Sequence, residues 1–299
     1  MAITTILAGC DLSAPADQAL ERAIAIALLH HARLVLVHAQ ADDGPIAEVT
    51  NEMLQQIGQV SAAVRIEEAR ALADRLARIQ AHGVTAEVII RTGPPGEVLA
   101  ALAVELQAEL IVIGTHGATG LSRFLLGSVA ASTIRHATCD VLVCRAPWSN
   151  TVFQRPLVAT DFLPTSSQAI SHASRVCVPG VPVDVVHAWQ LPTGSWGASL
   201  LGQARFPWST VRDAVVVAAK TQADKLTREY AALGQPVNVE LIQGPPAQVI
   251  THEAERRGHD LIAVGAHGHR GVRRLLLGSV AESTVRHSPC SVLVVHGAP

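Results

Sequence analysis

The sequence predicts an α/β protein of two tandem doubly wound domains, each built on a five-stranded parallel sheet. Three observations support this prediction: a length of 299 residues, an internal duplication, and short β-branched segments that alternate with longer helical ones. At about 150 residues per domain, the length suits two domains that each bury a core of their own. Alternating strands and helices are typical of sheets covered by helices on both faces.

The duplication is clearest towards the end of each half. Leu110–Arg145 and Leu261–His296 align at an offset of 265 − 114 = 151, with 21 identities in 36 positions. A period of about 150 residues is much longer than a solenoid repeat, so each copy is a whole domain. We therefore predict domains at residues 1–147 and 154–299, joined by a segment in which prolines and polar residues interrupt the pattern.

Each half is predicted to contain five strands separated by helices. Consecutive apolar positions, as in Leu110–Gly114, indicate strands covered on both faces, which is the pattern of parallel sheets. In the first half the expected strands are Thr4–Ala8, Arg33–His38, Thr85–Arg91, Leu110–Gly114 and Asp140–Cys144, and the expected helices are Ala16–His30, Glu67–Ala81, Gly96–Gln107 and Ser128–His136. In the second half the expected strands are Pro156–Thr160, Val183–His187, Val237–Ile242, Leu261–Gly265 and Ser291–Val295.

Composition excludes several classes of protein. Lys+Arg 23 against Asp+Glu 25 gives a net charge of −2, too balanced for non-specific binding to nucleic acid. An apolar fraction of 49% with so little net charge excludes a disordered chain. No membrane span or signal peptide is expected, because charged and histidine residues interrupt the apolar segment Ala23–Ala39 and the start lacks a basic region. Five cysteines without a framework spacing indicate reduced thiols in the cytoplasm.

The candidate ligand-binding residues follow the fourth strand of each half. A Gly-x-x-Gly pair, nine residues and a Gly-Ser dipeptide occur as Gly114, Gly117, Gly127 and Ser128, and again as Gly265, Gly268, Gly278 and Ser279. Glycines at the end of a strand let the backbone turn and approach a ligand. A Gly-Ser dipeptide that begins a helix presents free N–H groups, which suit a phosphate. Arg123 in the first copy, and Arg273 and Arg274 in the second, lie in the intervening loop and could close over that anion.

The same glycines also have a purely structural interpretation, in which they form a turn and a helix cap. Their recurrence at the same spacing favours binding, although shared descent alone could preserve a turn. Two other nucleotide motifs are excluded, because the sequence has no G-x-x-x-x-G-K-[ST] and the glycine spacing is not G-x-G-x-x-G.

Together with Asp11 and Asp161 at the end of the first strand of each half, this glycine pattern resembles the universal stress protein family, in two tandem copies that cover nearly the whole chain. The pattern is typical of the ATP-binding branch of that family. The resemblance implies a Rossmann-like sheet of strand order 3-2-1-4-5. In that order the first and fourth strands are neighbours at the switch point, where α/β sheets bind ligands.

The resemblance also implies a role for each matching residue. Asp11 and Asp161 would contact the adenosine, and Val37 and Val186 on the second strand would meet the adenine through their backbone. The ribose and phosphates would be held by Gly114, Gly117, Gly127, Ser128 and Val129 in the first copy, and by Gly265, Gly268, Gly278, Ser279 and Val280 in the second. Arg123 and Arg274 join the predicted site because of their place in the intervening loops. The second copy departs from the D-x-S form at Asp161, and three of the four tryptophans gather between Trp189 and Trp208. They would stack on adenine, obstruct the pocket or form an ordinary packed loop.

Other chemistries find less support. His267 and His269 could bind zinc with a third ligand, but the sequence has no C-x-x-C and no H-E-x-x-H, so no metal ligand is assigned. There is no G-x-S-x-G elbow and no carboxylate cluster, so no catalytic residue is assigned and hydrolysis of ATP would at most be slow.

We therefore expect a cytoplasmic stress-response protein that binds ATP, with magnesium, and acts as a nucleotide-dependent sensor or regulator. Its two domains are expected to pair within the chain through the edge strands Asp140–Cys144 and Ser291–Val295, and a homodimer is left open. The alternatives are a nucleotide-free pseudo-dimeric scaffold, and a weak ATP hydrolase or a zinc-binding stress factor. Neither nucleic acid nor a membrane is an expected partner.

Overall fold

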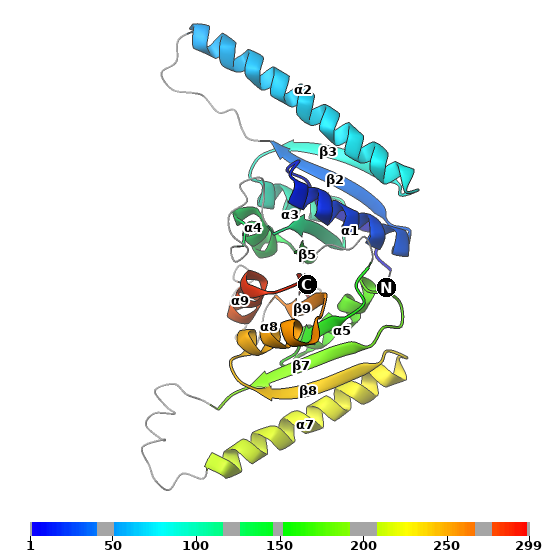
Figure 1. Cartoon of the computed structure of the whole chain (residues 1–299), viewed down its shortest axis with the longest axis vertical. Helices are drawn as coiled ribbons and strands as arrows, with labels where there is room; N and C mark the ends of the chain where they lie inside the picture. The colour runs from blue at the N-terminus through cyan, green and yellow to red at the C-terminus, as the bar shows by residue number, and fades with distance from the viewer. Residues whose placement is uncertain are drawn as a thin grey trace. The chain divides into compact units, whose positions relative to one another are not determined.

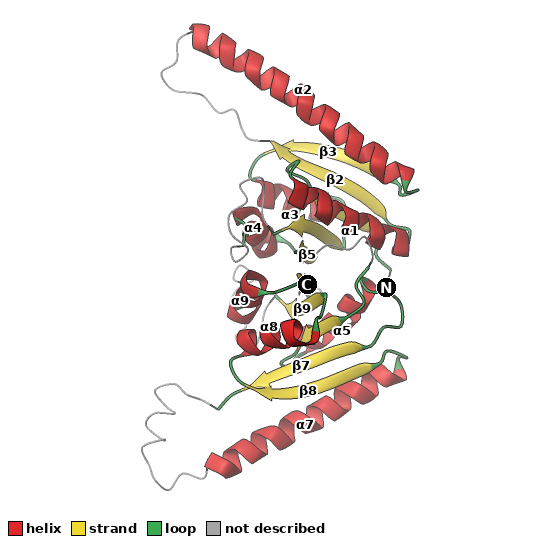
Figure 2. Cartoon of the chain, in the orientation of Figure 1, coloured by secondary structure: helices red, strands yellow, loops and turns green. Residues whose placement is uncertain are grey.

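The computed structural model describes residues 2–40, 51–115, 126–145, 152–191, 208–266 and 277–297. The chain forms two compact units, one ending at Val152 and the other running Phe153–Gly297, which we call the first and second halves. In each half a parallel sheet carries helices on both of its faces (Figures 1 and 2). The predicted α/β class is confirmed.

The first half contains a fully parallel sheet in the order β3-β2-β1-β4-β5. Its strands are β1 (Thr5–Gly9), β2 (Arg33–Gln40), β3 (Ala86–Thr92), β4 (Leu110–Gly114) and β5 (Asp140–Cys144), and its helices are α1 (Ala14–His30), α2 (Asn51–Ala81), α3 (Pro95–Glu105) and α4 (Ser128–His136). Right-handed crossovers put α1 and α2 on one face of this sheet, and α3 and α4, which contact each other, on the opposite face.

The second half repeats this arrangement, with its strands in the order β8-β7-β6-β9-β10 and all of them parallel. The strands are β6 (Pro156–Ala159), β7 (Val183–Trp189), β8 (Val237–Gln243), β9 (Leu261–Gly265) and β10 (Ser291–Val295), and the helices are α5 (Pro164–Arg175), α7 (Trp208–Ala232), α8 (Pro246–Arg257) and α9 (Ser279–His287). Both halves therefore have the 3-2-1-4-5 order that the family resemblance implies.

The core lies between each sheet and its helices. Consecutive residues of β4 and β9 are buried, because helices cover both faces of these central strands. Helix α1 presents Ala19, Ala23 and Ala27 to the sheet at a spacing of four residues, and these small side chains allow a close approach. Its start is fixed by Ser13, whose Oγ accepts a hydrogen bond from the Ala16 N–H at 3.3 Å.

The predicted start of α2 at Glu67 is wrong, because the helix begins at Asn51. Leu72 and Ile79 of α2 are buried, whereas Val60 and Ile66 are exposed. Met53, Ile57, Val60 and Val64 recur in the first part of α2 at spacings of three or four residues, so the sequence carried a helical signal that the prediction did not use. Strands β2 and β7 also end two residues later than predicted, at Gln40 and Trp189. The other element boundaries that we predicted agree within two residues.

Candidate functional site

The carboxyl ends of β1 and β4 lie side by side. Ile6 pairs with Leu110 and Ala8 with Val112, so the segments that follow the two strands leave the sheet at the same edge. The second half repeats this arrangement, with Leu157 opposite Ile262. This edge is the switch point of the fold, because the chain runs outward on one side of β1 and then returns to its other side.

Gly127 and Gly278 lie against the ends of β4 and β9. The Gly127 N–H donates a hydrogen bond to the Thr115 carbonyl at 2.9 Å, and the Gly278 N–H donates to the Ala266 carbonyl at 2.8 Å. Helices α4 and α9 therefore begin directly beside the ends of these strands. In both halves the residue that makes this contact is the glycine at the N-cap of the helix.

The first turns of α4 and α9 present backbone N–H groups without a side-chain cap. The N-cap residues, Gly127 and Gly278, have no side chain to accept a hydrogen bond from the turn. Ser128 and Ser279 are exposed, and so are Val129 and Val280. Uncapped N–H groups at a helix start carry a partial positive charge, so these two termini are suited to an anion.

Four of the predicted site residues lie outside the described part of the chain, together with three loop residues considered above. The predicted site residues are Gly117, Arg123, Gly268 and Arg274, and the others are Arg273, His267 and His269. Gly114 and Gly265 are the last residues of β4 and β9. The described site residues therefore consist of the two strand ends, the two helix starts and the segments after β1 and β6.

Asp11 lies on a tight turn after β1. Its Oδ1 accepts hydrogen bonds from the N–H, at 3.1 Å, and from the hydroxyl of Ser13. Leu12 between them has a left-handed backbone with φ of 64°, which is unfavourable for a branched side chain. Arg75 on α2 holds the turn from outside, since its guanidinium donates to the Leu12 carbonyl at 3.3 Å and to both carboxylate oxygens of Asp17.

Asp161 lies on the corresponding turn after β6, with a different set of partners. Phe162 has the same left-handed backbone, with φ of 62°. The Ser166 hydroxyl takes the place of Ser13 and donates to Asp161 Oδ1 at 2.6 Å, and the Phe162 N–H donates to the Thr160 hydroxyl at 2.9 Å. The longer D-x-x-x-x-S spacing therefore builds the same turn, although it departs from the sequence pattern of the first half.

The backbones of Val37 and Val186 already take part in the sheet. Their carbonyl oxygens accept hydrogen bonds from the N–H groups of Cys10 and Thr160, at 2.9 and 3.0 Å. Alternate residues of a strand direct their backbone groups to the same neighbouring strand, so Ala39 points the same way as Val37. Strand β1 ends at Gly9, opposite Val37, and no residue of β1 lies opposite Ala39.

Sequence reasoning did not single out Ala39 or, in the second half, Ala188. Their N–H and C=O groups point past the end of β1 and β6 towards the turns that carry the two aspartates. The pairing register of the first and second strands would have identified these two residues. Predicting that register requires the end of each strand to be placed within one residue. The contact of Val37 and Val186 with adenine stays a prediction.

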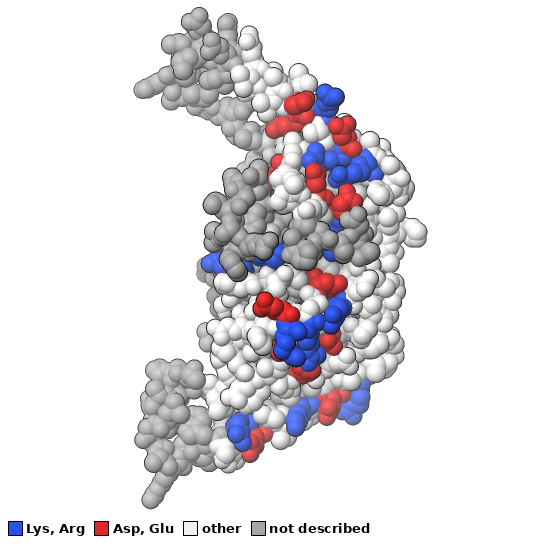
Figure 3. Space-filling model, viewed as in Figure 1, with Lys and Arg blue, Asp and Glu red and all other residues white. Residues whose placement is uncertain are grey.

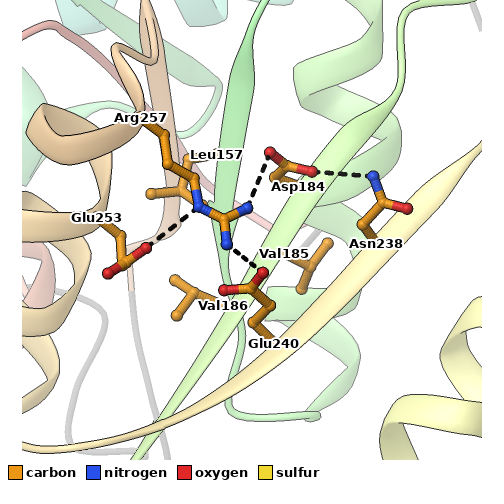
Figure 4. A pocket seen from close by; sticks show the side chains of 8 residues that line it. All are labelled: Leu157, Asp184, Val185, Val186, Asn238, Glu240, Glu253 and Arg257. Atoms are coloured by element: carbon orange, nitrogen blue, oxygen red, sulfur yellow. Dashed lines mark hydrogen bonds and ion pairs between the residues drawn. The ribbon is translucent and has the colours of Figure 1, made fainter.

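A second cluster of polar residues occupies a small pocket in the second half, between α8 and the strands β6, β7 and β8 (Figure 4). Arg257, at the end of α8, is its centre. Its guanidinium contacts Asp184 Oδ2 at 3.6 Å and Glu253 Oε2 at 3.3 Å, and it donates to Glu240. Asn238 donates to the other oxygen of Asp184 at 3.0 Å. The interior volume of about 10 Å³ has room for one water molecule.

This cluster is an ionic network rather than a ligand site. The hydrogen bond to Glu240 raises the pKa of Arg257, and a hydrogen bond from Arg256 lowers the pKa of Glu253, so these groups keep their charges. Asp184 lies near the amino end of β7, at the opposite end of the strand from Ala188. Figure 3 shows acidic and basic side chains interspersed on the visible face, in keeping with the small net charge.

The thiols of Cys10, Cys139 and Cys144 are not suited to nucleophilic chemistry. Burial raises the pKa of Cys10, next to Asp11, and raises the pKa of Cys139 and Cys144 to about 12. Within the described ranges, no three His, Cys, Asp or Glu side chains gather as a metal site would require. None of the helices in the described residues is both long and apolar enough to span a membrane.

Comparison with known proteins agrees with this fold. The universal stress protein family model matches residues 2–145 and 153–296. A universal stress protein of Mycolicibacterium smegmatis is 28% identical over 312 residues, which cover 97% of this chain and 96% of the relative. Universal stress protein Rv2005c of Mycobacterium tuberculosis is 28% identical over 197 residues, which cover 63% of this chain and 62% of the relative.

Solved structures show the same fold over the whole chain. A universal stress protein from Archaeoglobus fulgidus superposes with a TM-score of 0.67 at 22% identity, covering 98% of both chains. A functionally unknown protein from Pseudomonas aeruginosa PAO1 has a TM-score of 0.67 at 17% identity and covers 98% of this chain and 92% of its own. Because the family model matches both halves, the chain belongs to the universal stress protein family as a tandem two-domain member.

Proposed function

We propose that this protein binds ATP, with Mg²⁺, at the carboxyl edge of its sheets and acts as a nucleotide-dependent sensor or regulator in the stress response. The observation that carries the proposal is the return of Gly127 and Gly278 to the ends of β4 and β9, at 2.9 and 2.8 Å. This return places an uncapped helix start beside the switch point in both halves. The protein would act in the cytoplasm, where its cysteines would stay reduced.

The phosphates would bind at the starts of α4 and α9. Each start offers N–H groups of its first turn and the hydroxyl of Ser128 or Ser279. A helix N-terminus attracts negative charge, and a glycine at the N-cap leaves room for a phosphate oxygen close to the backbone. The positive potential for a triphosphate would therefore come from local groups, which is compatible with a net charge of −2.

The adenosine would bind at the turns after β1 and β6. Ser13 holds Oδ1 of Asp11, which orients the carboxylate so that its other oxygen can accept hydrogen bonds from ribose hydroxyls. The backbone of Ala39 would serve the adenine edge, since both its N–H and its C=O point past the end of β1. Asp161 and Ala188 would serve the same purposes in the second half.

Calorimetry with ATP and Mg²⁺ tests the proposal. The wild type, Gly127→Val, Gly278→Val and the double variant would be titrated, and each single variant serves as the control for the other half. The valine side chain would occupy the space of the phosphate. We expect the affinity of the altered half to fall at least about ten-fold, which is about 1.4 kcal/mol, and the double variant to lose both sites. Equal heats for all four proteins would contradict the site assignment.

Native mass spectrometry of the protein as purified separates the proposal from its alternatives. A mass increase equal to one or two adenine nucleotides supports it. A nucleotide-free chain that also gives no heat with ATP would favour the scaffold alternative, and a retained zinc ion would favour the zinc-binding one. The same spectrum reports the oligomeric state.

A further inference from the structure

A histidine on the neighbouring strand holds the turn of each aspartate. His38, near the end of β2, is 6% exposed, and its Nδ1 lies 2.8 Å from the carbonyl oxygen of Cys10, the residue before Asp11. A carbonyl oxygen can only accept, so Nδ1 carries the proton and donates. The two residues are 28 positions apart in the chain, and only the sheet brings them together.

The second half contains the same contact. The Nδ1 of His187 lies 2.9 Å from the carbonyl oxygen of Thr160, the residue before Asp161. The N–H groups of Cys10 and Thr160 donate to β2 and β7 as well, at 2.9 and 3.0 Å. Both backbone groups of the residue before each aspartate are therefore hydrogen-bonded: its N–H donates to a strand carbonyl, and its C=O accepts from an imidazole.

The turns need such support because their next residues are strained. Leu12 and Phe162 have φ values of 64° and 62°, and a left-handed backbone at a residue other than glycine costs about 1 kcal/mol or more. Without an anchor on the preceding carbonyl, the peptide could rotate and the strain would be released. The carboxylate of Asp11 or Asp161 would then leave the position that it needs beside the helix start.

The outer side of each imidazole has a different neighbour. In the first half, Nε2 of His38 lies 3.7 Å from Oε1 of Glu68 on α2. The other carboxylate oxygen, Oε2, accepts a hydrogen bond from Gln40 at 3.0 Å. In the second half, the ring of His187 packs on the ring of Phe162, with centroids 4.5 Å apart. The contact shared by both halves is thus the one through Nδ1.

We infer that His38 and His187 are positioning residues of the two nucleotide sites, each fixing the left-handed turn that carries its aspartate by donating Nδ1–H to the preceding carbonyl. This inference rests on the proposed function for its effect on ATP, but the hydrogen bond itself is tested without any ligand. Neither histidine is expected to touch the nucleotide.

The amides asparagine and glutamine give a matched pair of variants. The amide nitrogen of asparagine is bonded to Cγ, as Nδ1 of histidine is, so His38→Asn keeps a donor for Cys10. His38→Gln moves the amide one atom further out and loses that donor. In a Gly278→Val background, which reports the first site alone, we expect the affinity for MgATP to fall about ten-fold in His38→Gln and to stay within about three-fold of the parent in His38→Asn.

Amide hydrogen exchange of Ser13 is the readout that is independent of ATP, because the Ser13 N–H donates to Asp11 Oδ1. We expect exchange about ten-fold faster in His38→Gln and near the parent rate in His38→Asn. Unchanged exchange in His38→Gln, or equal acceleration in both variants, would overturn the inference. A parent that binds no MgATP while the exchange pattern holds would contradict the proposed function and leave the positioning role supported.

The corresponding pair, His187→Asn and His187→Gln in a Gly127→Val background, repeats the test in the second half. The amide of Leu163 is the reporter there, since it donates to Asp161 Oδ1 at 3.1 Å. Thermal unfolding of all variants checks that they are folded. The same order of effects in both halves is expected, and a reversal in the second half would overturn the inference for His187.

Discussion

The layer between the sheet and α3 in the first half is apolar, whereas the matching layer against α8 in the second half is charged. The aligned positions are Val35, Ile89, Leu102 and Leu106 in the first half, and Asp184, Glu240, Glu253 and Arg257 in the second. Val35 and Leu102 are almost completely buried. In the second half, three carboxylates surround one guanidinium in the same location (Figure 4).

The fold therefore accepts either apolar or charged side chains in the layer between the sheet and this helix. The strand order and the register are the same in both halves, so the order of elements and the apolar central strands are sufficient to specify it. Charges that are partly withdrawn from water need partners, and Arg257 contacts all three acids, while Arg256 also pairs with Glu253. The two halves therefore serve as natural controls for each other, and the predictions below exchange their residues.

The largest effect is expected where α3 meets α4. A methyl group on Gly96 would lie 2.5 Å from Cβ of Ser132 and 2.8 Å from the backbone nitrogen of Thr133, so the two helices would have to separate. The second half has Ala247 at this position. We expect Gly96→Ala to lower the free energy of unfolding by about 3 kcal/mol, and Ala247→Gly by about 1 kcal/mol or less, as measured by urea denaturation. Equal losses would show that the helices of the first half are not packed more closely.

A smaller loss is expected when Arg257 is replaced alone. Arg257→Leu leaves Asp184, Glu240 and Glu253 without their shared cation, and a partly exposed network of this kind should cost about 2 kcal/mol. The fourfold variant Asp184→Val, Glu240→Ile, Glu253→Leu and Arg257→Leu restores the apolar set of the first half. We expect its free energy of unfolding to lie within about 1 kcal/mol of the wild type or above it. A fourfold variant as unstable as Arg257→Leu would show that the second half requires the charges.

The turn after α3 offers a gain in stability. Gln107 has φ of 51°, and the aligned residue after α8 is Gly258 with φ of 65°. Glycine adopts this backbone without strain. We therefore expect Gln107→Gly to raise the free energy of unfolding by about 1 kcal/mol and Gly258→Gln to lower it by a similar amount. The midpoint of thermal unfolding should rise in the first variant and fall in the second. Opposite signs in the two variants are the test, and the same sign in both would contradict this explanation.

The smallest effect is a pH dependence confined to the second half. Burial lowers the pKa of His259 from its ordinary value of 6.5, against the hydrogen bond to the Arg155 carbonyl and the charge of Asp184, which raise it. The charges of Arg155 and Arg257 add to the lowering. The unfolded chain therefore binds its proton first as the pH falls. We expect the free energy of unfolding to decrease from about pH 6.5 down to the folded-state pKa, and no further below it.

His259→Ala is the matched control for this prediction, because Ala108 stands at the aligned position of the first half. The variant should be less stable at every pH, since it loses the hydrogen bond between Nδ1 and the Arg155 carbonyl at 3.0 Å. Its stability should nevertheless change less between pH 7.5 and pH 5.5 than that of the wild type, as measured by thermal melting at each pH. An unchanged slope would mean that other groups cause the dependence.

Most of the secondary structure was predictable because its signals are local. The bounds of β4, β5, α4, β9 and β10 agree to the residue, since each is marked by a run of apolar residues or by a glycine and a serine at a helix start. The first part of α2 was missed, although Met53, Ile57, Val60 and Val64 recur at helical spacing in the sequence.

The candidate site was predictable only in part. The aspartates, the glycines and the serines are visible in the sequence because they recur at a fixed spacing in both halves. The sequence did not reveal that the backbone of Ala39 points past the end of β1, since this depends on β1 ending at Gly9. The sequence signal for Val37 was its position on the second strand, which does not reveal the direction of its backbone groups.

The sequence by itself determined the duplication, the α/β class and the places where the backbone must turn beside a helix start. These properties follow from residues near one another in the chain, so a pattern and its repeat are enough. Only the tertiary structure decided that His38 reaches Cys10, 28 residues away, and that Arg257 gathers the acids of two strands and its own helix. Such contacts depend on strand register and side-chain direction, and neither is set by the local order of residues.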